Sequence, residues 1–310
     1  MARVRRAEKS SSDTYTWLVV RQFPPKEELQ KALLEQSYLA DRGLATALYL
    51  ALSLERPILV EGEAGVGKTE LAKSLAGAID AELIRLQCWE GIDANQALYE
   101  WDYPRQLLYL RAIGEREAAG EEAVEALFGP RFLVERPLLR ALRAGGNAVL
   151  LIDEVDRADD EFEAFLLEIL SDFQVTVPEI GAIRAERPPA VVVTSNRTRE
   201  LHDALKRRCL YHWIDYPSLD REVEIVRIRA PDVPEELARK VAIAVARIRE
   251  LDLVKRPGVA ETIDWARAVA LLGATSLEPE VVGETLGWVV KERDDVERVR
   301  ASLAEGPGDG

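Results

Sequence analysis

The sequence is poor in the side chains that bind soft metals or form disulfides. Its 310 residues include two cysteines, Cys88 and Cys209, two histidines, His202 and His212, and one methionine. Their spacing matches no zinc-binding pattern, and two isolated cysteines are better explained as reduced thiols with packing roles. These absences argue against a zinc site and a disulfide framework. Any bound metal should therefore be a hard cation held by oxygen atoms.

Long apolar runs and a basic charge balance are also missing. No apolar stretch approaches the roughly 18 residues of a membrane span, and the basic start, MARVRR, leads to an apolar run too short for a signal peptide. The net charge is −14, which argues against broad binding to a phosphate backbone. We therefore expect a cytoplasmic protein with no membrane span and no nucleic-acid partner.

The apolar residues that are present predict an alternation of strands and helices. Four short buried runs are typical of strands: ILVEG from residue 58, LIRLQ from 83, AVLLI from 148 and VVVTS from 191. Segments of helical periodicity separate them, residues 26–54 read as helix, and helical periodicity dominates after Tyr216. Ser218 is a candidate N-cap there. The pattern favours an α/β fold with a parallel sheet covered on both faces.

The strongest motif is GEAGVGKT, which fits G-x-x-x-x-G-K-[ST] in full between a predicted strand and a predicted helix. Its glycines let backbone N–H groups converge on phosphate oxygens at a helix N-terminus. Lys68 would reach the β- and γ-phosphates, and the Thr69 hydroxyl would ligate Mg²⁺. The residues expected to hold the nucleotide are Gly62, Glu63, Ala64, Gly65, Val66, Gly67, Lys68, Thr69 and Glu70.

Two acidic residues end the third predicted strand, in VLLIDE. Asp153 would hold the Mg²⁺ shell together with Thr69, and Glu154 would polarise the attacking water. A glutamate directly after the aspartate favours attack by water, and so hydrolysis, over transfer to a second substrate.

Further polar candidates follow the fourth predicted strand. Asn196 ends VVVTSN and can position the water, and Arg207 and Arg208 lie in LHDALKRRCLYHW. An arginine finger stabilises charge on the γ-phosphate and can be worth about 10³- to 10⁵-fold in rate. The sequence does not decide between these two arginines. If one of them acts in trans, the enzyme works only as a ring.

Taken in order, GEAGVGKT, VLLIDE, VVVTSN and ALKRRC, followed by a helical region, resemble an AAA+ ATPase over about residues 28–300. The resemblance implies a P-loop NTPase three-layer sandwich, ATP rather than GTP as substrate, and a ring, with a hexamer expected. The domains implied are a basic, Ser-rich leader (1–25), a nucleotide-binding core (26–216), a smaller all-α lid (217–304) and a flexible tail (305–310).

Two additions resemble the MoxR branch of that family: a hairpin at about 173–189, before Asn196, and an insertion at about 88–110. The insertion is similar to that of the CoxD-like subgroup. This implies a chaperone for a molybdenum hydroxylase of the carbon monoxide dehydrogenase type, working beside a von Willebrand factor A-domain partner. Tyr99, Trp101 and Tyr103 either present a rigid surface to this client or pack the insertion onto the core.

The chain departs from the family where a sensor 2 arginine would open a lid helix. GVAET, at 258–262, has none, and Arg256 and Arg267 are the nearby substitutes. The N-terminal TYTWLVVRQ has no counterpart in the family pattern. Two other functions stay open: a nucleic-acid-associated NTPase motor similar to the McrB group, and a slow nucleotide switch that binds a partner without remodelling it.

Overall fold

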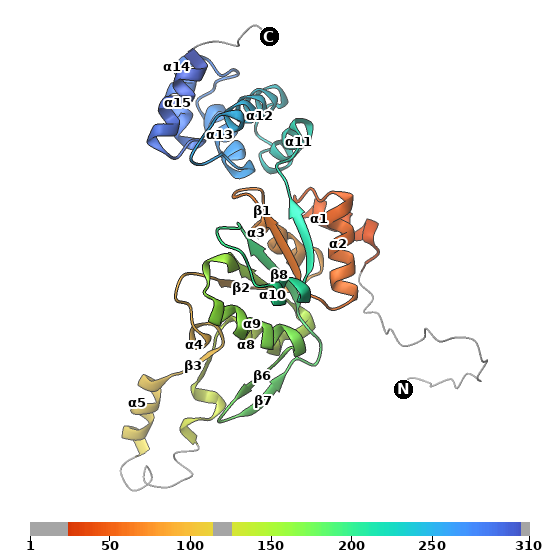
Figure 1. Ribbon diagram of the computed structural model, residues 1–310, viewed down its shortest axis with the longest axis vertical. Helices are drawn as coiled ribbons and strands as arrows, with labels where there is room; N and C mark the ends of the chain where they lie inside the picture. The colour runs from red at the N-terminus through yellow and green to blue at the C-terminus, as the bar shows by residue number, and fades with distance from the viewer. Residues whose placement is uncertain (1–23, 114–125, 305–310) are drawn as a thin grey trace, which may run out of the picture.

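The core of the protein is a five-stranded parallel sheet (Figure 1). The computed structural model describes residues 24–113 and 126–304, so the predicted tail and nearly all of the predicted leader lie outside the described residues. The strands are, in spatial order, β2 (Glu82–Gln87), β5 (Ala148–Asp153), β8 (Ala190–Ser195), β1 (Ile58–Gly62) and β9 (Leu210–Ile214). All neighbours in this sheet run parallel, so the predicted fold class is confirmed.

The sequence predicted four of these strands and missed β9. β9 lies at the edge of the sheet beside β1, and its residues are mostly half-buried. Because only one neighbour pairs with it, it lacks the fully apolar run by which a central parallel strand is recognised. The unpredicted strand fixes the start of the segment that leads to the C-terminal helices.

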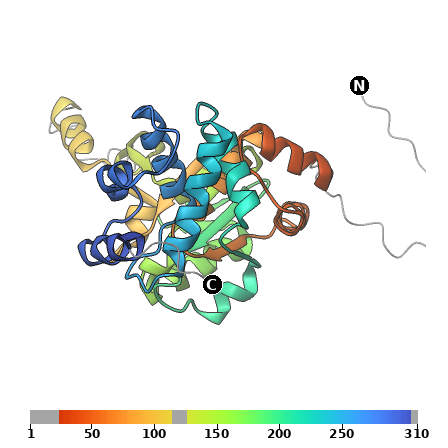
Figure 2. The same cartoon turned by 90° about the horizontal axis from the view of Figure 1, so that it is seen from above.

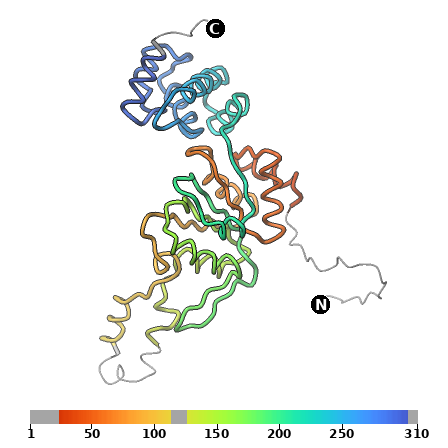
Figure 3. The backbone as a smooth tube through the Cα atoms, viewed as in Figure 1, coloured from red at the N-terminus to blue at the C-terminus, as the bar shows by residue number. Residues whose placement is uncertain are grey.

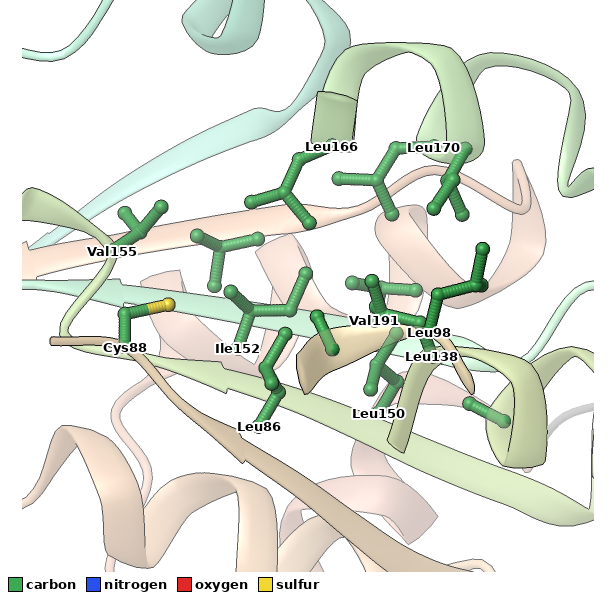
Figure 4. Packing of buried hydrophobic residues seen from close by; sticks show 14 of the residues in the cluster. Leu86, Cys88, Leu98, Leu138, Leu150, Ile152, Val155, Leu166, Leu170 and Val191 are labelled. Atoms are coloured by element: carbon green, nitrogen blue, oxygen red, sulfur yellow. The ribbon is translucent and has the colours of Figure 1, made fainter. Parts of the chain in front are cut away.

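Helices cover both faces of the sheet, which gives three layers (Figure 1). Alternation along the strands divides the apolar side chains: Ile58 and Val60 of β1 pack on one side, and Leu59 packs on the other. Figure 4 shows Leu150 and Ile152 of β5 among Leu166 and other side chains of the second face. The helices are α1 (Lys26–Glu35), α2 (Arg42–Ser53) and α3 (Lys68–Ala78) on the first face, and α8 (Pro137–Ala144), α9 (Asp160–Asp172) and α10 (Asp203–Arg208) on the second.

The segment predicted as helix over 26–54 is in fact two helices, α1 and α2. Ser37 between them has φ of 59°, a left-handed conformation that interrupts helical geometry. Asp41 then caps α2, because its Oδ1 accepts a hydrogen bond from the Leu44 N–H at 2.7 Å. The leucine periodicity was correct, but it did not reveal the break.

The insertion after β2 extends away from the body of the molecule (Figures 1 and 3). It contains α4 (Ala94–Ala97), β3 (Tyr99–Trp101), α5 (Tyr103–Ile113), a 3₁₀ turn (Pro130–Phe132) and β4 (Leu133–Glu135). β3 and β4 form an antiparallel pair, and α5 projects furthest in both views (Figures 1 and 2).

The aromatic residues of the insertion divide between its two expected roles. Trp101 is 6% exposed and packs edge-on against Phe128 at 5.3 Å between ring centroids. Tyr99 is half-buried beside it, at 6.1 Å. Tyr103, at the start of α5, is 60% exposed. Trp101 and Tyr99 therefore pack the insertion, and of the three only Tyr103 is available to a partner.

The segment between α9 and β8 forms an antiparallel hairpin. Its strands are β6 (Gln174–Val177) and β7 (Gly181–Arg184), with Val175 opposite Ile183. Val175 and Val177 are buried, so one face of the hairpin packs on the body of the molecule.

Five helices after β9 form a separate apolar cluster around Trp265, which is fully buried. They lie over the core when the molecule is seen from above (Figure 2). Ser218 is the N-cap residue of the first of them, although its side chain makes no capping hydrogen bond. No helix among the described residues is long and apolar enough to cross a membrane. The five are α11 (Leu219–Arg229), α12 (Glu235–Glu250), α13 (Val259–Leu271), α14 (Pro279–Thr285) and α15 (Arg293–Ala304).

Candidate active site

The glycine-rich loop connects the end of β1 to the start of α3. Gly65 and Gly67 have φ of 77° and 98°, values that residues with a Cβ atom rarely adopt. Gly67 is also the N-cap of α3, so the first free N–H groups of that helix border the loop. The local sequence thus builds a cradle of backbone donors at a helix N-terminus, which suits an anionic phosphate.

Lys68 is held inside this loop and is 6% exposed. Its Nζ donates to the Gly62 carbonyl at 2.8 Å and to the Glu63 carbonyl at 2.6 Å. Burial lowers the pKa of Lys68, and nearby acids, Asp156 first among them, act in the opposite direction. The ammonium group is therefore placed by backbone carbonyls at the mouth of the phosphate cradle.

Asp153 ends β5 with a side chain that is 2% exposed. Its Oδ1 accepts from the Thr194 hydroxyl at 2.6 Å and from the Thr69 hydroxyl at 3.0 Å. Its Oδ2 accepts from the Arg85 guanidinium, at 2.6 Å to Nη2 and 3.0 Å to Nε. The two residues predicted as metal ligands, Thr69 and Asp153, are thus brought into direct contact.

Glu154 lies immediately after β5 and has left-handed backbone angles, with φ of 54° and ψ of 51°. Its Oε1 accepts from the Asn196 amide at 3.3 Å. Its Oε2 accepts from the Gln87 amide at 3.1 Å and pairs with Arg157 Nε at 2.9 Å. Glu154 and Asn196, which were predicted to act on the same water, are therefore neighbours at the carboxyl edge of the sheet.

These side chains border a cavity of about 650 Å³, a volume in the range of small-molecule sites. Residues 64–70, Asp153, Glu154 and Asn196 line one part of it, whereas Gly62 and Glu63, also predicted to hold the nucleotide, do not. Tyr38, from the α1–α2 connection, lines another part, and burial raises the pKa of its phenol. The end of β9 with the segment that follows it (212–218), and residues of α11 and α13, close the remaining side.

The C-terminal helices touch the glycine-rich loop directly. The Gly65 carbonyl accepts from the Val259 N–H at 2.9 Å and from the Ala260 N–H at 3.3 Å, at the start of α13. A Cβ on Gly258 would lie 2.5 Å from the Gly65 Cα. Backbone therefore meets backbone here, at the place where the family pattern would have an arginine.

Neither predicted sensor 2 substitute lines the cavity. Arg256 and Arg267 are exposed, and Arg267 instead donates to the Arg229 carbonyl. Two arginines of α11, Arg221 and Arg229, do line it, and Arg229 pairs with Glu70 at 2.7 Å. The sequence held no local signal for them, because α11 shows only an ordinary mixture of acids and arginines.

Arg207 and Arg208 end α10 and are exposed. Neither lines the cavity of its own chain. Their backbone carbonyls accept hydrogen bonds from the Arg56 guanidinium, at 2.7 Å for Arg207 and 3.1 Å for Arg208. Neither side chain thus reaches the cavity of its own chain, and a role as an arginine finger in a neighbouring subunit stays a prediction.

Sequence reasoning missed three residues that hold the predicted acids: Arg85, Gln87 and Thr194. Each of them lies on a strand that the sequence predicts correctly. The sequence does not give the register of strand pairing, which places Gln87 of β2 opposite Asp153 of β5. A polar residue at the end of a buried strand was the one available signal.

Comparison with known proteins agrees with this geometry. Residues 57–209 match the family described as AAA domain (dynein-related subfamily). An uncharacterized protein of Staphylococcus haemolyticus is 26% identical over 182 residues, which cover 56% of this chain and 61% of that protein. One of Staphylococcus saprophyticus is 25% identical over 183 residues, covering 57% and 62%. The match thus spans about three fifths of these relatives.

Among solved structures, a variant of RuvB from Thermotoga maritima is 18% identical, covers 93% of this chain and 81% of its own, and has a TM-score of 0.48. The RuvB Holliday junction branch migration motor of the same organism is 17% identical, covers 94% and 79%, and scores 0.46. The finer assignment to the MoxR branch stays a prediction. The range that matches the AAA domain (dynein-related subfamily), residues 57–209, contains the glycine-rich loop, both acids, Asn196 and both α10 arginines.

Proposed function

We propose that this chain is a Mg²⁺-dependent ATPase that works as a ring, with six subunits expected, to remodel a client protein. The observation that carries the proposal is the arrangement of two adjacent carboxylates at the cavity. Asp153 touches Thr69 at the end of the phosphate cradle, and Glu154 touches Asn196 beside it. This arrangement supports a role for Asp153 at a metal and for Glu154 at a water.

The donor atoms at Thr69 and Asp153 suit Mg²⁺. This cation usually takes one or two carboxylates together with phosphate oxygens and retained waters, and here one hydroxyl and one carboxylate are in contact. The described residues contain no cluster of three or more His, Cys, Asp or Glu that would suit a metal held by protein alone. When bound, Mg²⁺ would neutralise charge that develops on the β- and γ-phosphates.

The remaining side chains supply orientation and proton transfer. Lys68 and the backbone of the glycine-rich loop would hold the phosphates of ATP. Glu154 would accept a proton from the attacking water while the Asn196 amide orients it. Because Arg207 and Arg208 lie outside the cavity of their own chain, we assign the arginine finger to the adjoining subunit of the ring.

The lid would sense the nucleotide through one backbone contact and one ion pair. The Gly65 carbonyl bonds to the start of α13, and Arg229 bonds to Glu70. A shift of the glycine-rich loop or of α3 would therefore change the position of the C-terminal helices, which gives ATP turnover a mechanical output.

The client would bind at the insertion. Leu107 and Leu108 on α5 are 59% and 66% exposed, and Tyr103 precedes them. On the resemblance to the CoxD-like subgroup, the client would be a molybdenum hydroxylase, acting with a von Willebrand A-domain partner. We place this activity in the cytoplasm, where unpaired buried thiols such as Cys88 and Cys209 are usual.

A pull-down with Glu154→Gln in ATP and Mg²⁺ tests the proposal. Loss of the carboxylate should trap the ATP-bound ring on its client. The matched control adds Lys68→Ala, which removes phosphate binding, so a true client appears only with the single variant. Recovery of a von Willebrand A-domain protein or a hydroxylase subunit would support the chaperone. Recovery of DNA or a nuclease subunit would favour the nucleic-acid motor instead.

A further inference from the structure

Arg85 makes the one ion pair that Asp153 forms among the described residues. The two residues come from neighbouring strands, β2 and β5, and their side chains differ greatly in burial. Asp153 is 2% exposed, whereas Arg85 is 49% exposed. Two guanidinium nitrogens donate to one oxygen, Oδ2. The Thr194 hydroxyl donates to Oδ1, and the Thr69 hydroxyl lies 3.0 Å from Oδ1 and 3.2 Å from Oδ2.

A buried carboxylate needs a compensating positive charge as well as hydrogen bonds. The hydroxyls of Thr69 and Thr194 are neutral donors. The ammonium of Lys68 is directed at the carbonyls of Gly62 and Glu63. Arg85 therefore supplies the positive charge in direct contact with Asp153.

The same carboxylate is one of the two protein ligands assigned above to Mg²⁺. A guanidinium on Oδ2 and a divalent cation at this carboxylate carry charges of the same sign, and each lowers the affinity of Asp153 for the other. The half-exposed Arg85 side chain can leave for solvent at little cost, whereas Asp153 cannot move out of the core.

We propose that Arg85 is a built-in competitor of the divalent cation. It neutralises Asp153 while no metal is bound and is displaced when the metal arrives, so it sets the Mg²⁺ concentration at which the site fills. Arg85 is a positioning residue that acts through Asp153, since it does not line the nucleotide cavity. The proposal rests on the Mg²⁺-dependent ATPase function proposed above.

The experiment measures metal affinity rather than turnover. Full-length protein is loaded with a fluorescent ADP analogue in EDTA and then titrated with Mg²⁺, and the midpoint of the Mg²⁺-dependent change is recorded. In Arg85→Gln the midpoint should fall about fivefold, the amount expected when a partly exposed ion pair no longer competes. Affinity for the analogue in EDTA should not change.

Arg140→Gln is the matched control. Arg140 on α8 is 56% exposed and also forms an ion pair, with Glu82 of β2. Glu82 lies opposite Ala148, at the other end of β5 from Asp153. The midpoint of Arg140→Gln should equal that of the wild type. Arg85→Lys keeps the charge without the two-nitrogen contact, so its midpoint should lie between those of the wild type and Arg85→Gln, and it serves if Arg85→Gln folds poorly.

Two results would overturn the inference in distinguishable ways. If the wild type responds to Mg²⁺ and both Arg85 variants have the same or a higher midpoint, Arg85 does not compete and the proposed ATPase function is untouched. If the wild type binds the analogue with no response to Mg²⁺, the Mg²⁺ site itself is absent, and both the inference and the proposed function fail.

Discussion

The carboxyl edge of the sheet and the insertion after β2 both carry acidic side chains, in opposite settings. Asp153 is 2% exposed and accepts hydrogen bonds from three other residues. Glu100 in the insertion is 50% exposed and pairs with Arg136, which is 42% exposed. A surface pair of this kind contributes little to the free energy of folding. A buried carboxylate that accepts hydrogen bonds from several donors is held in one position. An acidic side chain is thus held in place by several donors in one region and is largely solvated in the other.

The largest effect should come from Arg207 and Arg208, which lie in neither of these two regions. Replacement of Arg207 and Arg208 by glutamate should lower ATP turnover by about 10³- to 10⁵-fold if one of them completes the sheet-edge site of a neighbouring chain. The measurement is phosphate release as a function of protein concentration, with Arg187→Glu, another exposed arginine, as control.

Mixing experiments decide whether the arginine acts in trans. Subunits with the double reversal retain Glu154, and Glu154→Gln subunits retain both arginines, so a mixed ring should regain activity where the two meet. An equal mixture as inactive as its parts would place any role of these arginines within one chain. Turnover per chain that survives the reversal and ignores concentration would remove the finger altogether.

The second effect compares the two regions directly. Glu154→Gln should reduce turnover by about 10²- to 10⁴-fold, the usual contribution of a general base, while binding of an ATP analogue stays near the wild-type value. Glu100→Gln changes the same functional group in the insertion and should leave turnover unchanged. Equal losses in both variants would mean that the insertion takes part in hydrolysis.

The sequence predicted the features that depend on residues adjacent along the chain. The glycine-rich loop, its lysine and the two acids are local patterns, and the strand that carries each is a short apolar run. Arg85 and Thr194 were missed because they reach Asp153 across strands. Register decides such meetings, and register is set by the packing of whole sheet faces. The strand β9 was missed for a similar reason, since its pairing with β1 defines it. The break at Ser37 is a local turn, in which the Tyr38 N–H donates to the Leu33 carbonyl at 2.9 Å, and the leucine spacing does not reveal it.

The third effect concerns stability within the insertion. Trp101→Ala should lower the free energy of unfolding by about 3–5 kcal/mol, as for other large buried side chains, because Trp101 packs against Tyr99 and Phe128. Leu108→Ala, at a position 66% exposed, should change it by less than about 0.5 kcal/mol. Denaturant unfolding measures both. A large loss for Leu108→Ala would show that α5 is covered by another part of the chain and is not open to a client.

The smallest effect tests the contact between the C-terminal helices and the glycine-rich loop. Gly258→Ala would place a Cβ 2.5 Å from the Gly65 Cα and 2.8 Å from the Ala64 carbonyl oxygen, so we expect a loss of about 1–3 kcal/mol, typical of overpacking. Gly283 in α14 has no atom within 4 Å of an added Cβ, and Gly283→Ala should stabilise by about 0.5–1 kcal/mol. If denaturant unfolding shows that Gly258→Ala destabilises the protein and Gly283→Ala stabilises it, the steric constraint lies at the contact between Gly258 and the glycine-rich loop. Gly258→Ala could instead leave the free energy of unfolding unchanged and weaken nucleotide binding. In that case the C-terminal helices, rather than the glycine-rich loop, would have shifted to accommodate the added Cβ, and the position of these helices would affect nucleotide binding.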